Sequence, residues 1–157
     1  MQFIDLAAQR ARIGDRIDLA VSKVIREGKY ILGPEVAEFE RKLADYVGVK
    51  HVVACANGTD ALLIPLFAFG VGRGDAVFCP SFTFAATAEV VALAGAVPVF
   101  IDIDPDTYNI DIAQLKAAIK AIKAEGRLTP KAIIPVDLFG LAADYSALMA
   151  VAEAEGL

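Results

Sequence analysis

CANGTDAL, residues 55–62, lies where an apolar, strand-like run gives way to helical spacing. The run before it, 51–55, is typical of a buried strand, and Ala61, Leu62 and Leu66 then recur at helical intervals. The pair Asn57-Gly58 between them indicates a tight turn. The stretch therefore predicts a strand, a turn and a helix N-terminus, which is a building unit of layered α/β domains.

The start of this predicted helix is a candidate anion site. The first N–H groups of a helix have no partner within the helix and carry the positive end of its dipole, so they stabilise a phosphate without any lysine or arginine. Gly58 would let a ligand approach the backbone closely, and Thr59 adds a hydroxyl donor. The alternative is that Asn57 or Thr59 only caps the helix. From this stretch alone, both interpretations stay open.

Composition predicts one globular domain. The chain has 157 residues, of which 57% are hydrophobic, which indicates extensive interior or interface surface. The longest weakly polar run, 61–71, is about half of the ~20 residues that a bilayer requires, and the first residues lack the basic region of a secretory signal. A net charge of −5 with scattered lysines and arginines argues against a nucleic-acid partner. We therefore expect neither a membrane nor a nucleic acid as partner.

The cysteines and the single histidine argue against a metal site. Cys55 and Cys79 both lie in apolar, strand-like runs without CxxC spacing, so we predict buried free thiols in a reducing cytoplasm. His51 is the only histidine, which excludes a multi-histidine metal centre. We expect it at the start of a strand.

Two amphipathic helices are predicted ahead of the opening stretch. Apolar residues recur on one face over 7–27, and Gly28 is typical of a helix end. Pro34 suits the first turn of the second helix. The loop between them, 29–33, contains Tyr30 and two aliphatic residues. Because these side chains are unusually apolar for a loop, we expect them to pack at a subunit interface or to face a ligand.

Strands and helices alternate from residue 51 onward. Strands that are continuous apolar runs are typical of a mostly parallel sheet that is buried on both faces, so we predict an α/β fold with helices flanking the sheet. Asp111 and Gln114 form a start similar to a capping box. The predicted strands are 51–55, 76–79, 97–101 and 131–136, and the predicted helices are 59–69, 84–94, 111–125 and 144–155.

Ligands of open α/β sheets bind beyond the carboxyl ends of the strands, so the segments that follow the predicted strands form the candidate site. Asp102 and Asp104 lie there, but we expect them to shape a turn through Pro105 rather than to act as acid or base. The segments of the candidate site are 57–60, 80–84, 102–104 and 137–140.

Three motifs carry a family resemblance: CANGTDAL (55–62), the run GVGRGDAVFCPSFTF to DPDTYNID (70–111), and KAIIPVDLFG (131–140). They resemble the N-terminal part of the DegT/DnrJ/EryC1/StrS family of pyridoxal-phosphate-dependent nucleotide-sugar aminotransferases. The opening FIDLAAQRARI with GKYILGPEV (28–36) is similar to the branch that acts on sugars of the UDP-2-acetamido-3-keto-glucuronate type. The resemblance covers the whole chain, with the motifs in the family's order and spacing.

The resemblance implies an aspartate-aminotransferase-like fold (fold type I), whose large domain binds pyridoxal 5'-phosphate. Residues 1–34 would be an N-terminal helix and loop, and 35–157 would be the first part of the large domain. The C-terminal part of that domain and the small domain would be absent, so the fold would be truncated.

By position, the resemblance assigns the cofactor contacts. Gly58, Thr59 and the amide of Asp60 would hold the cofactor phosphate, in agreement with the helix-terminus argument. Phe84 would stack over the pyridine ring; the alternative is a core phenylalanine at a helix start. Tyr30, in the apolar loop, is a weak candidate for a substrate contact.

Asn57, beside the phosphate turn, is a second weak candidate for a substrate contact.

The resemblance places the reactive groups beyond this chain. The lysine that forms the Schiff base and the acid that faces the pyridine nitrogen would follow Leu157. The lysines present are assigned to solvated positions, so no catalytic residue is assigned. Asp137 is a minor candidate for the acid, and Leu141 replaces a residue that is often glutamine in the family.

The implied activity of the full-length protein is transfer of an amino group from glutamate to a nucleotide-linked keto sugar, in polysaccharide or related sugar biosynthesis. The resemblance implies a cytoplasmic homodimer, and the chain alone should be inactive. One alternative is a sugar dehydratase of the same family. Another is a non-catalytic nucleotide-binding module, suggested by the glycines of 70–74, although these follow a helix and precede a strand, which reverses the dinucleotide fingerprint.

Overall fold

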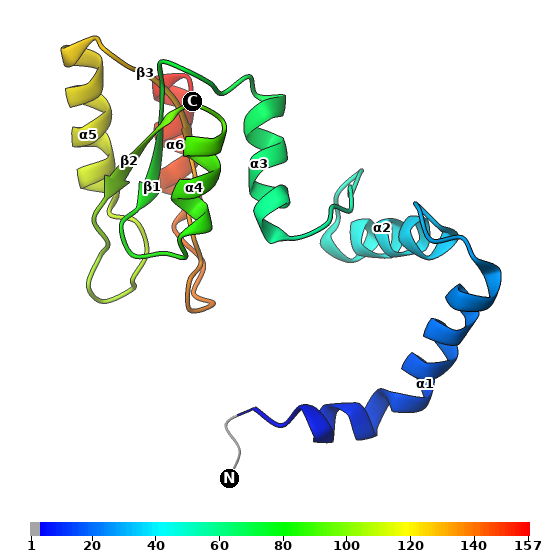
Figure 1. Cartoon of the computed structure of the whole chain (residues 1–157). Coiled ribbons are helices and arrows are strands. Elements are labelled where there is room, and N and C mark those ends of the chain that lie inside the picture. Colours follow the sequence, from blue (N-terminus) through cyan, green and yellow to red (C-terminus); the bar gives the residue numbers. More distant parts are fainter. Residues whose placement is uncertain (1–3) are drawn as a thin grey trace. The chain divides into compact units, whose positions relative to one another are not determined.

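The computed structural model describes residues 4–157, which fall into two compact units separated after Ala54 (Figure 1). The predicted division after residue 34 stays a prediction, and the helix that follows it lies in the first compact unit. Among the described helices, none combines the length and apolar character needed to cross a membrane.

The first unit contains the two predicted helices, α1 (Leu6–Glu27) and α2 (Pro34–Val47). Asp5 caps α1 by accepting the backbone N–H of Ala8 at 2.8 Å. The helix ends at Gly28, whose φ of 68° lies in the left-handed region that favours glycine. Both helix predictions are confirmed.

The loop between α1 and α2 is held by a glycine and an ion pair. Gly33 is buried, and a Cβ atom at this position would collide with the backbone carbonyl oxygen of Lys29, so only glycine fits. The Lys23 ammonium lies 3.0 Å from Glu35 and links α1 to the first turn of α2. The apolar side chains of the loop point to solvent in this unit, with Ile31 91% exposed.

The second unit is built on a parallel sheet with the strand order β2-β1-β3. The central strand, β1 (Asp75–Pro80), pairs with β2 (Val97–Ile101) on one side and with β3 (Thr129–Ile133) on the other. Phe78 lies beside Val99 in this register. The predicted parallel α/β arrangement is therefore confirmed.

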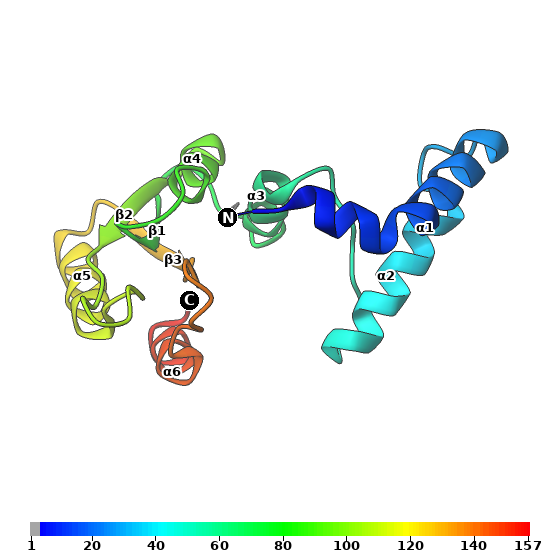
Figure 2. The same cartoon turned by 90° about the horizontal axis from the view of Figure 1, so that it is seen from below.

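Helices cover both faces of the sheet, with α4 on one side and α5 and α6 on the other (Figure 2), and α3 packs beside α4. Side chains alternate along a strand, so neighbouring residues of β1 enter different clusters. Val77 packs in the cluster of α3 and α4, whereas Ala76 and Phe78 pack in the cluster of α5 and α6. The bounds are α3 (Gly58–Ala68), α4 (Ala86–Leu93), α5 (Ile112–Glu125) and α6 (Tyr145–Glu155).

The predicted start of α5 is confirmed. The Asp111 carboxylate accepts the backbone N–H groups of Ala113 and Gln114 at 2.7 and 3.0 Å. The Gln114 amide reaches back to this carboxylate at 3.2 Å rather than to a backbone group. Leu115 and Ile119 lie on the buried face of the helix, as expected.

The predicted strand 51–55 is wrong. No strand among the described residues pairs with this segment, and the backbone N–H of Ala54 instead donates to the Glu40 carboxylate at 2.8 Å. Val53 is 79% exposed. An apolar run becomes a strand only where another strand offers backbone donors and acceptors, and the three-stranded sheet offers none here. His51 therefore lies in a loop and not at a strand start.

The prediction of two buried thiols is half wrong. Cys55 is exposed because its segment is not in the sheet. Cys79 lies in β1 and is buried, which raises the pKa of its thiol to about 11. Both thiols are unpaired, as predicted.

Leu115→Ala should lower the free energy of unfolding by about 2–5 kcal/mol, because it leaves a cavity beside β1. Lys116→Ala, on the exposed side of the same helix, should change it by no more than about 0.5 kcal/mol. Urea unfolding followed by far-UV circular dichroism measures both. Equal effects of the two substitutions would contradict the assigned core.

Candidate functional site

The turn that opens α3 has free backbone donors. Asn57 is the N-cap, and its side-chain oxygen accepts the N–H of Asp60 at 2.9 Å while its carbonyl accepts the N–H of Ala61 at 3.1 Å. Within residues 4–157, the N–H groups of Gly58 and Thr59 find no acceptor. Nothing lies within 4 Å of a Cβ atom built on Gly58, so the space beside the turn is open. These two amides and the Thr59 hydroxyl can receive an anion.

The capping interpretation of Asn57 is confirmed, and the candidate anion site, which stays a prediction, lies at the same helix start. The amide of Asp60, one of the three predicted phosphate contacts, is already used by the Asn57 side chain. Asn57 also donates to the Asp60 carboxylate at 3.2 Å. Asp60 could offer its amide to a ligand only if Asn57 released it. The assignment of the Asp60 amide to the cofactor phosphate stays a prediction, as does the assignment of Asn57 to a substrate contact.

The segment after β1 carries Phe84 into solvent. The backbone N–H of Ser81 donates to the Ile101 carbonyl at 2.7 Å, so the segment begins in register with β2. The hydroxyls of Thr83 and Thr87 lie 3.0 Å apart and tie its other end to α4. Phe84 is 73% exposed, so in this chain it is not the core phenylalanine of the alternative interpretation. Its ring is available to a ligand, and the stacking role stays a prediction.

The predicted turn role of Asp104 is confirmed. Its carboxylate accepts the backbone N–H groups of Asp106 and Thr107 at 3.0 and 2.9 Å and the Thr107 hydroxyl at 3.1 Å. These hydrogen bonds lower the pKa of Asp104 below its usual value. Asp102 similarly accepts the N–H of Ile103 at 2.8 Å. Both side chains therefore shape the connection after β2.

Asp137 orders the connection after β3. One carboxylate oxygen accepts the N–H of Ala143 at 2.8 Å, and the other accepts the hydroxyl of Tyr145 at 3.1 Å. Partial burial, together with Asp137, raises the pKa of Tyr145. This geometry gives Asp137 a structural role, which is against the minor hypothesis that it faces a pyridine nitrogen.

The structure brings together three aromatic rings that sequence reasoning did not combine. Phe82 follows β1, Tyr108 follows β2 and Phe139 follows β3. Their ring centroids are 6.0 Å apart for Phe82 and Tyr108, 6.1 Å for Phe82 and Phe139, and 5.4 Å for Tyr108 and Phe139. The signal was an aromatic residue in each connection that follows a strand. Phe82 and Phe139 lay within the predicted site segments 80–84 and 137–140, but Tyr108 lay outside the segment 102–104.

Tyr30 stays a prediction as a substrate contact. It lies in the first unit, where its hydroxyl donates to the carbonyl of Ile25 at 3.0 Å and its side chain is 66% exposed. This hydrogen bond fixes the tyrosine at the end of α1.

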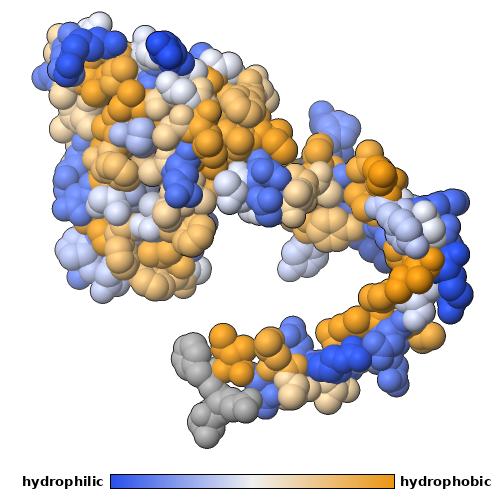
Figure 3. Space-filling model, in the orientation of Figure 1, coloured by the Kyte–Doolittle hydropathy of each residue, from blue (hydrophilic) through white to orange (hydrophobic). Residues whose placement is uncertain are grey.

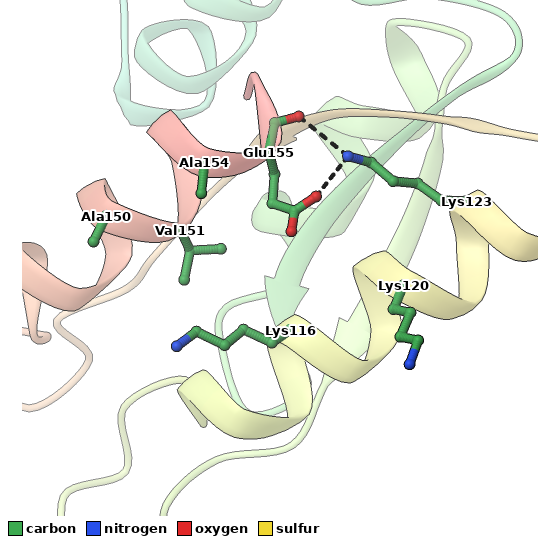
Figure 4. A pocket seen from close by; sticks show the side chains of 7 residues that line it. All are labelled: Lys116, Lys120, Lys123, Ala150, Val151, Ala154 and Glu155. Carbon is green, nitrogen blue, oxygen red and sulfur yellow. Dashed lines mark hydrogen bonds and ion pairs between the residues drawn. The ribbon is translucent and has the colours of Figure 1, made fainter.

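A groove of about 450 Å³ lies between α5 and α6 (Figure 4). Lys116, Lys120 and Lys123 line it from α5, and Glu155 lines it from α6. Lys123 pairs with Glu155 at 2.5 Å, whereas Lys120 points away from α6. All three lysines are exposed, as the sequence predicts, and they lie on a helical face rather than at the turn of α3.

Comparisons with known proteins agree with the sequence motifs. The model of the DegT/DnrJ/EryC1/StrS aminotransferase family matches residues 11–157. UDP-2-acetamido-2-deoxy-3-oxo-D-glucuronate aminotransferase of Pseudomonas aeruginosa is 55% identical over 159 residues, which cover 100% of this chain and 42% of that protein. The chain thus spans about two fifths of the length of this curated relative.

Solved structures give the same result. A DegT DnrJ EryC1 StrS aminotransferase from Brucella abortus is 70% identical with a TM-score of 0.98, and the match covers 100% of this chain and 42% of that one. NtdA from Bacillus subtilis, solved with bound cofactor PMP, is 33% identical with a TM-score of 0.79, over 91% of this chain and 31% of that one. The predicted resemblance and the predicted truncated fold are therefore confirmed.

Asn57→Ala should destabilise the start of α3 by about 1 kcal/mol, because it removes the acceptor of the Asp60 amide. Asn57→Asp keeps an acceptor and is the matched control. Hydrogen exchange at the Asp60 amide should become faster in the alanine variant only. Unchanged exchange in that variant would show that the cap does not hold this amide.

The Asp104 turn should weaken in acid. Because its folded-state pKa is lowered, the carboxylate contributes stability above its unfolded pKa of about 3.9, and this contribution is lost as the pH falls through the folded value. A carbon-13 NMR titration should find the pKa of Asp104 below its usual value, and Thr107→Val should raise it. A pKa of Asp104 that is the same in both proteins would contradict the role of the threonine.

Proposed function

The chain belongs to the DegT/DnrJ/EryC1/StrS aminotransferase family, and from this premise we propose that it is the N-terminal part of a pyridoxal-phosphate-dependent sugar aminotransferase. The full-length protein would move an amino group from glutamate to a nucleotide-linked keto sugar. The similarity to an enzyme named for a UDP-linked 3-oxo sugar acid supports a substrate of that class and a place in polysaccharide or related sugar biosynthesis.

The open turn of α3 is the observation that supports this proposal most directly. The free N–H groups of Gly58 and Thr59 lie at the positive end of the helix dipole, where they would hold the cofactor phosphate together with the Thr59 hydroxyl. The exposed ring of Phe84 would cover one face of the pyridine.

When bound, the cofactor supplies an electron sink for the bonds at the reacting carbon. The residues of this chain would bind and orient it. On this proposal the reactive lysine and the acid that faces the pyridine nitrogen lie in the other part of the full-length protein, so these 157 residues alone would be inactive.

We propose that the full-length protein is a cytoplasmic homodimer. Apolar residues of the first unit are open to solvent, as Figure 3 shows for the surface of its helices, and contiguous apolar surface is typical of an interface. The unpaired thiols agree with a reducing compartment. The exposed residues are Ile13, Ile17, Val21 and Ile25 of α1 and Tyr30, Ile31 and Leu32 of the following loop.

The two alternative functions have less support. The matching family and the relatives from Pseudomonas aeruginosa and Brucella abortus are named as aminotransferases, which does not favour the dehydratase. A dinucleotide-binding module requires its glycines between a strand and a following helix. Here Gly70 and Gly74 lie between the end of α3 and the start of β1, and the backbone N–H of Gly70 donates to the carbonyl of Phe67 as part of the helix end.

The full-length protein should gain visible absorbance when pyridoxal phosphate is added and lose it when glutamate follows. Thr59→Val should raise the Kd for the cofactor about 10- to 100-fold, because a hydrogen bond to a charged group contributes about 1.5–3 kcal/mol. Thr59→Ser keeps the hydroxyl and should bind as the unchanged protein does. Absorbance titration measures all three.

A full-length protein that stays colourless with pyridoxal phosphate would contradict the proposed function. Equal affinities for the valine and serine variants would contradict the phosphate contact while leaving the cofactor assignment intact.

A further inference from the structure

We propose that Phe82, Tyr108 and Phe139, here called the aromatic cluster, position Phe84 for its contact with the cofactor ring. The inference rests on the proposed function, in which Phe84 stacks on the pyridine. It assigns the cluster a role through Phe84, without contact between the three rings and the cofactor.

The cluster joins the three connections that follow the strands. Each pair of rings lies within the distance at which aromatic side chains attract each other, and Tyr108 meets Phe139 edge to face at an interplanar angle of 85°. The rings are only partly covered, with 46% of Phe82, 45% of Tyr108 and 69% of Phe139 exposed. They are therefore not part of the hydrophobic core.

The segment that carries Phe84 is held by hydrogen bonds at both ends. At its start, the N–H of Ser81 donates to the Ile101 carbonyl; at its end, the hydroxyls of Thr83 and Thr87 lie 3.0 Å apart and the Phe84 carbonyl accepts the backbone N–H of Thr87 at 3.0 Å. Among the aromatic pairs found in residues 4–157, this segment takes part only through Phe82, which pairs with the other two members of the cluster. Phe84 follows Phe82 by two residues, so the contacts of Phe82 limit where the ring of Phe84 can lie.

Tyr108 is held in an unusual backbone conformation. Its φ of 60° lies in the left-handed region, which a tyrosine adopts only where its surroundings fix it. Its backbone N–H donates to the Asp104 carbonyl at 2.8 Å, and the N–H of Asp104 donates to the carbonyl of Asn109 at 2.9 Å. The strained conformation is thus maintained by a closed turn, and it directs the ring toward Phe139.

Asn109 ties this turn to the connection after β3. Its side chain is buried, with 8% of the residue exposed, and it donates to the carbonyls of Leu141 and Ala142, each at 3.3 Å. The connections that carry Tyr108 and Phe139 are therefore joined by hydrogen bonds as well as by their rings. Phe82 therefore packs against two rings whose connections are already joined to each other. In this way, residues distant in the sequence can order the segment that carries Phe84.

The test uses the full-length protein and a cycle of substitutions. Tyr108→Asn removes the ring but keeps a residue that tolerates the left-handed conformation, and Tyr108→Phe keeps the ring as the matched control. Phe84→Leu removes the stacking ring. Each variant, and the double variant of Phe84→Leu with Tyr108→Asn, is titrated with pyridoxal phosphate to obtain Kd. Hydrogen exchange of the cofactor-free proteins is measured as a second readout.

We expect Tyr108→Asn to raise Kd several-fold and Tyr108→Phe to leave it unchanged. In the Phe84→Leu background, Tyr108→Asn should raise Kd no further, because it acts through the lost ring. In the cofactor-free protein, Tyr108→Asn should speed exchange at residues 82–84 and leave 58–60 unchanged. If Tyr108→Asn does not fold, Phe139→Leu removes a different ring of the cluster and carries the same expectations.

Outcomes that overturn the inference differ from those that overturn the proposed function. If Phe84→Leu weakens cofactor binding but Tyr108→Asn does not, the positioning role is wrong and the function stands. Additive effects in the double variant would show that Tyr108 acts on the ligand by another route. Failure of the unchanged protein to bind pyridoxal phosphate would overturn both.

Discussion

The burial of β1 on both faces is the constraint on which the second unit depends. Val77 and Phe78 are fully buried, but they enter opposite hydrophobic clusters. A strand in this position needs helices above and below it and a hydrogen-bonded strand on either side, and the chain supplies all four neighbours in turn. The carboxyl ends of the three parallel strands then open toward the same edge, which places the connections after them close together.

At that edge, hydrogen bonds from short polar side chains give the connections their shape. Asp104 closes the turn after β2, Asp137 folds the connection after β3, and Asn109 joins the two. Each of these side chains satisfies backbone donors or acceptors that an irregular segment would otherwise leave unpaired. Polar groups that resemble catalytic acids in the sequence are therefore used for structure, while exposed amides and aromatic rings remain for a ligand.

The site illustrates which inferences a sequence can support. The cap at Asn57 and the turn at Asp104 follow from residues within three or four positions of each other, and both predictions were confirmed. The strand 51–55 and the buried Cys55 were wrong because an apolar run cannot specify its own partner. The aromatic cluster was missed because Tyr108 is separated from Phe82 and Phe139 by whole helices and strands.

The sequence by itself determined the order of helices and strands in 75–155, the helix ends and caps, and a family membership that its motifs made recognisable. Only the tertiary structure decided which apolar run joined the sheet, which faces α3 to α6 cover, and which rings meet at the carboxyl edge. The physical reason is one of range. Periodicity and capping act over a few residues, whereas strand pairing and ring packing depend on segments that only the folded chain brings together.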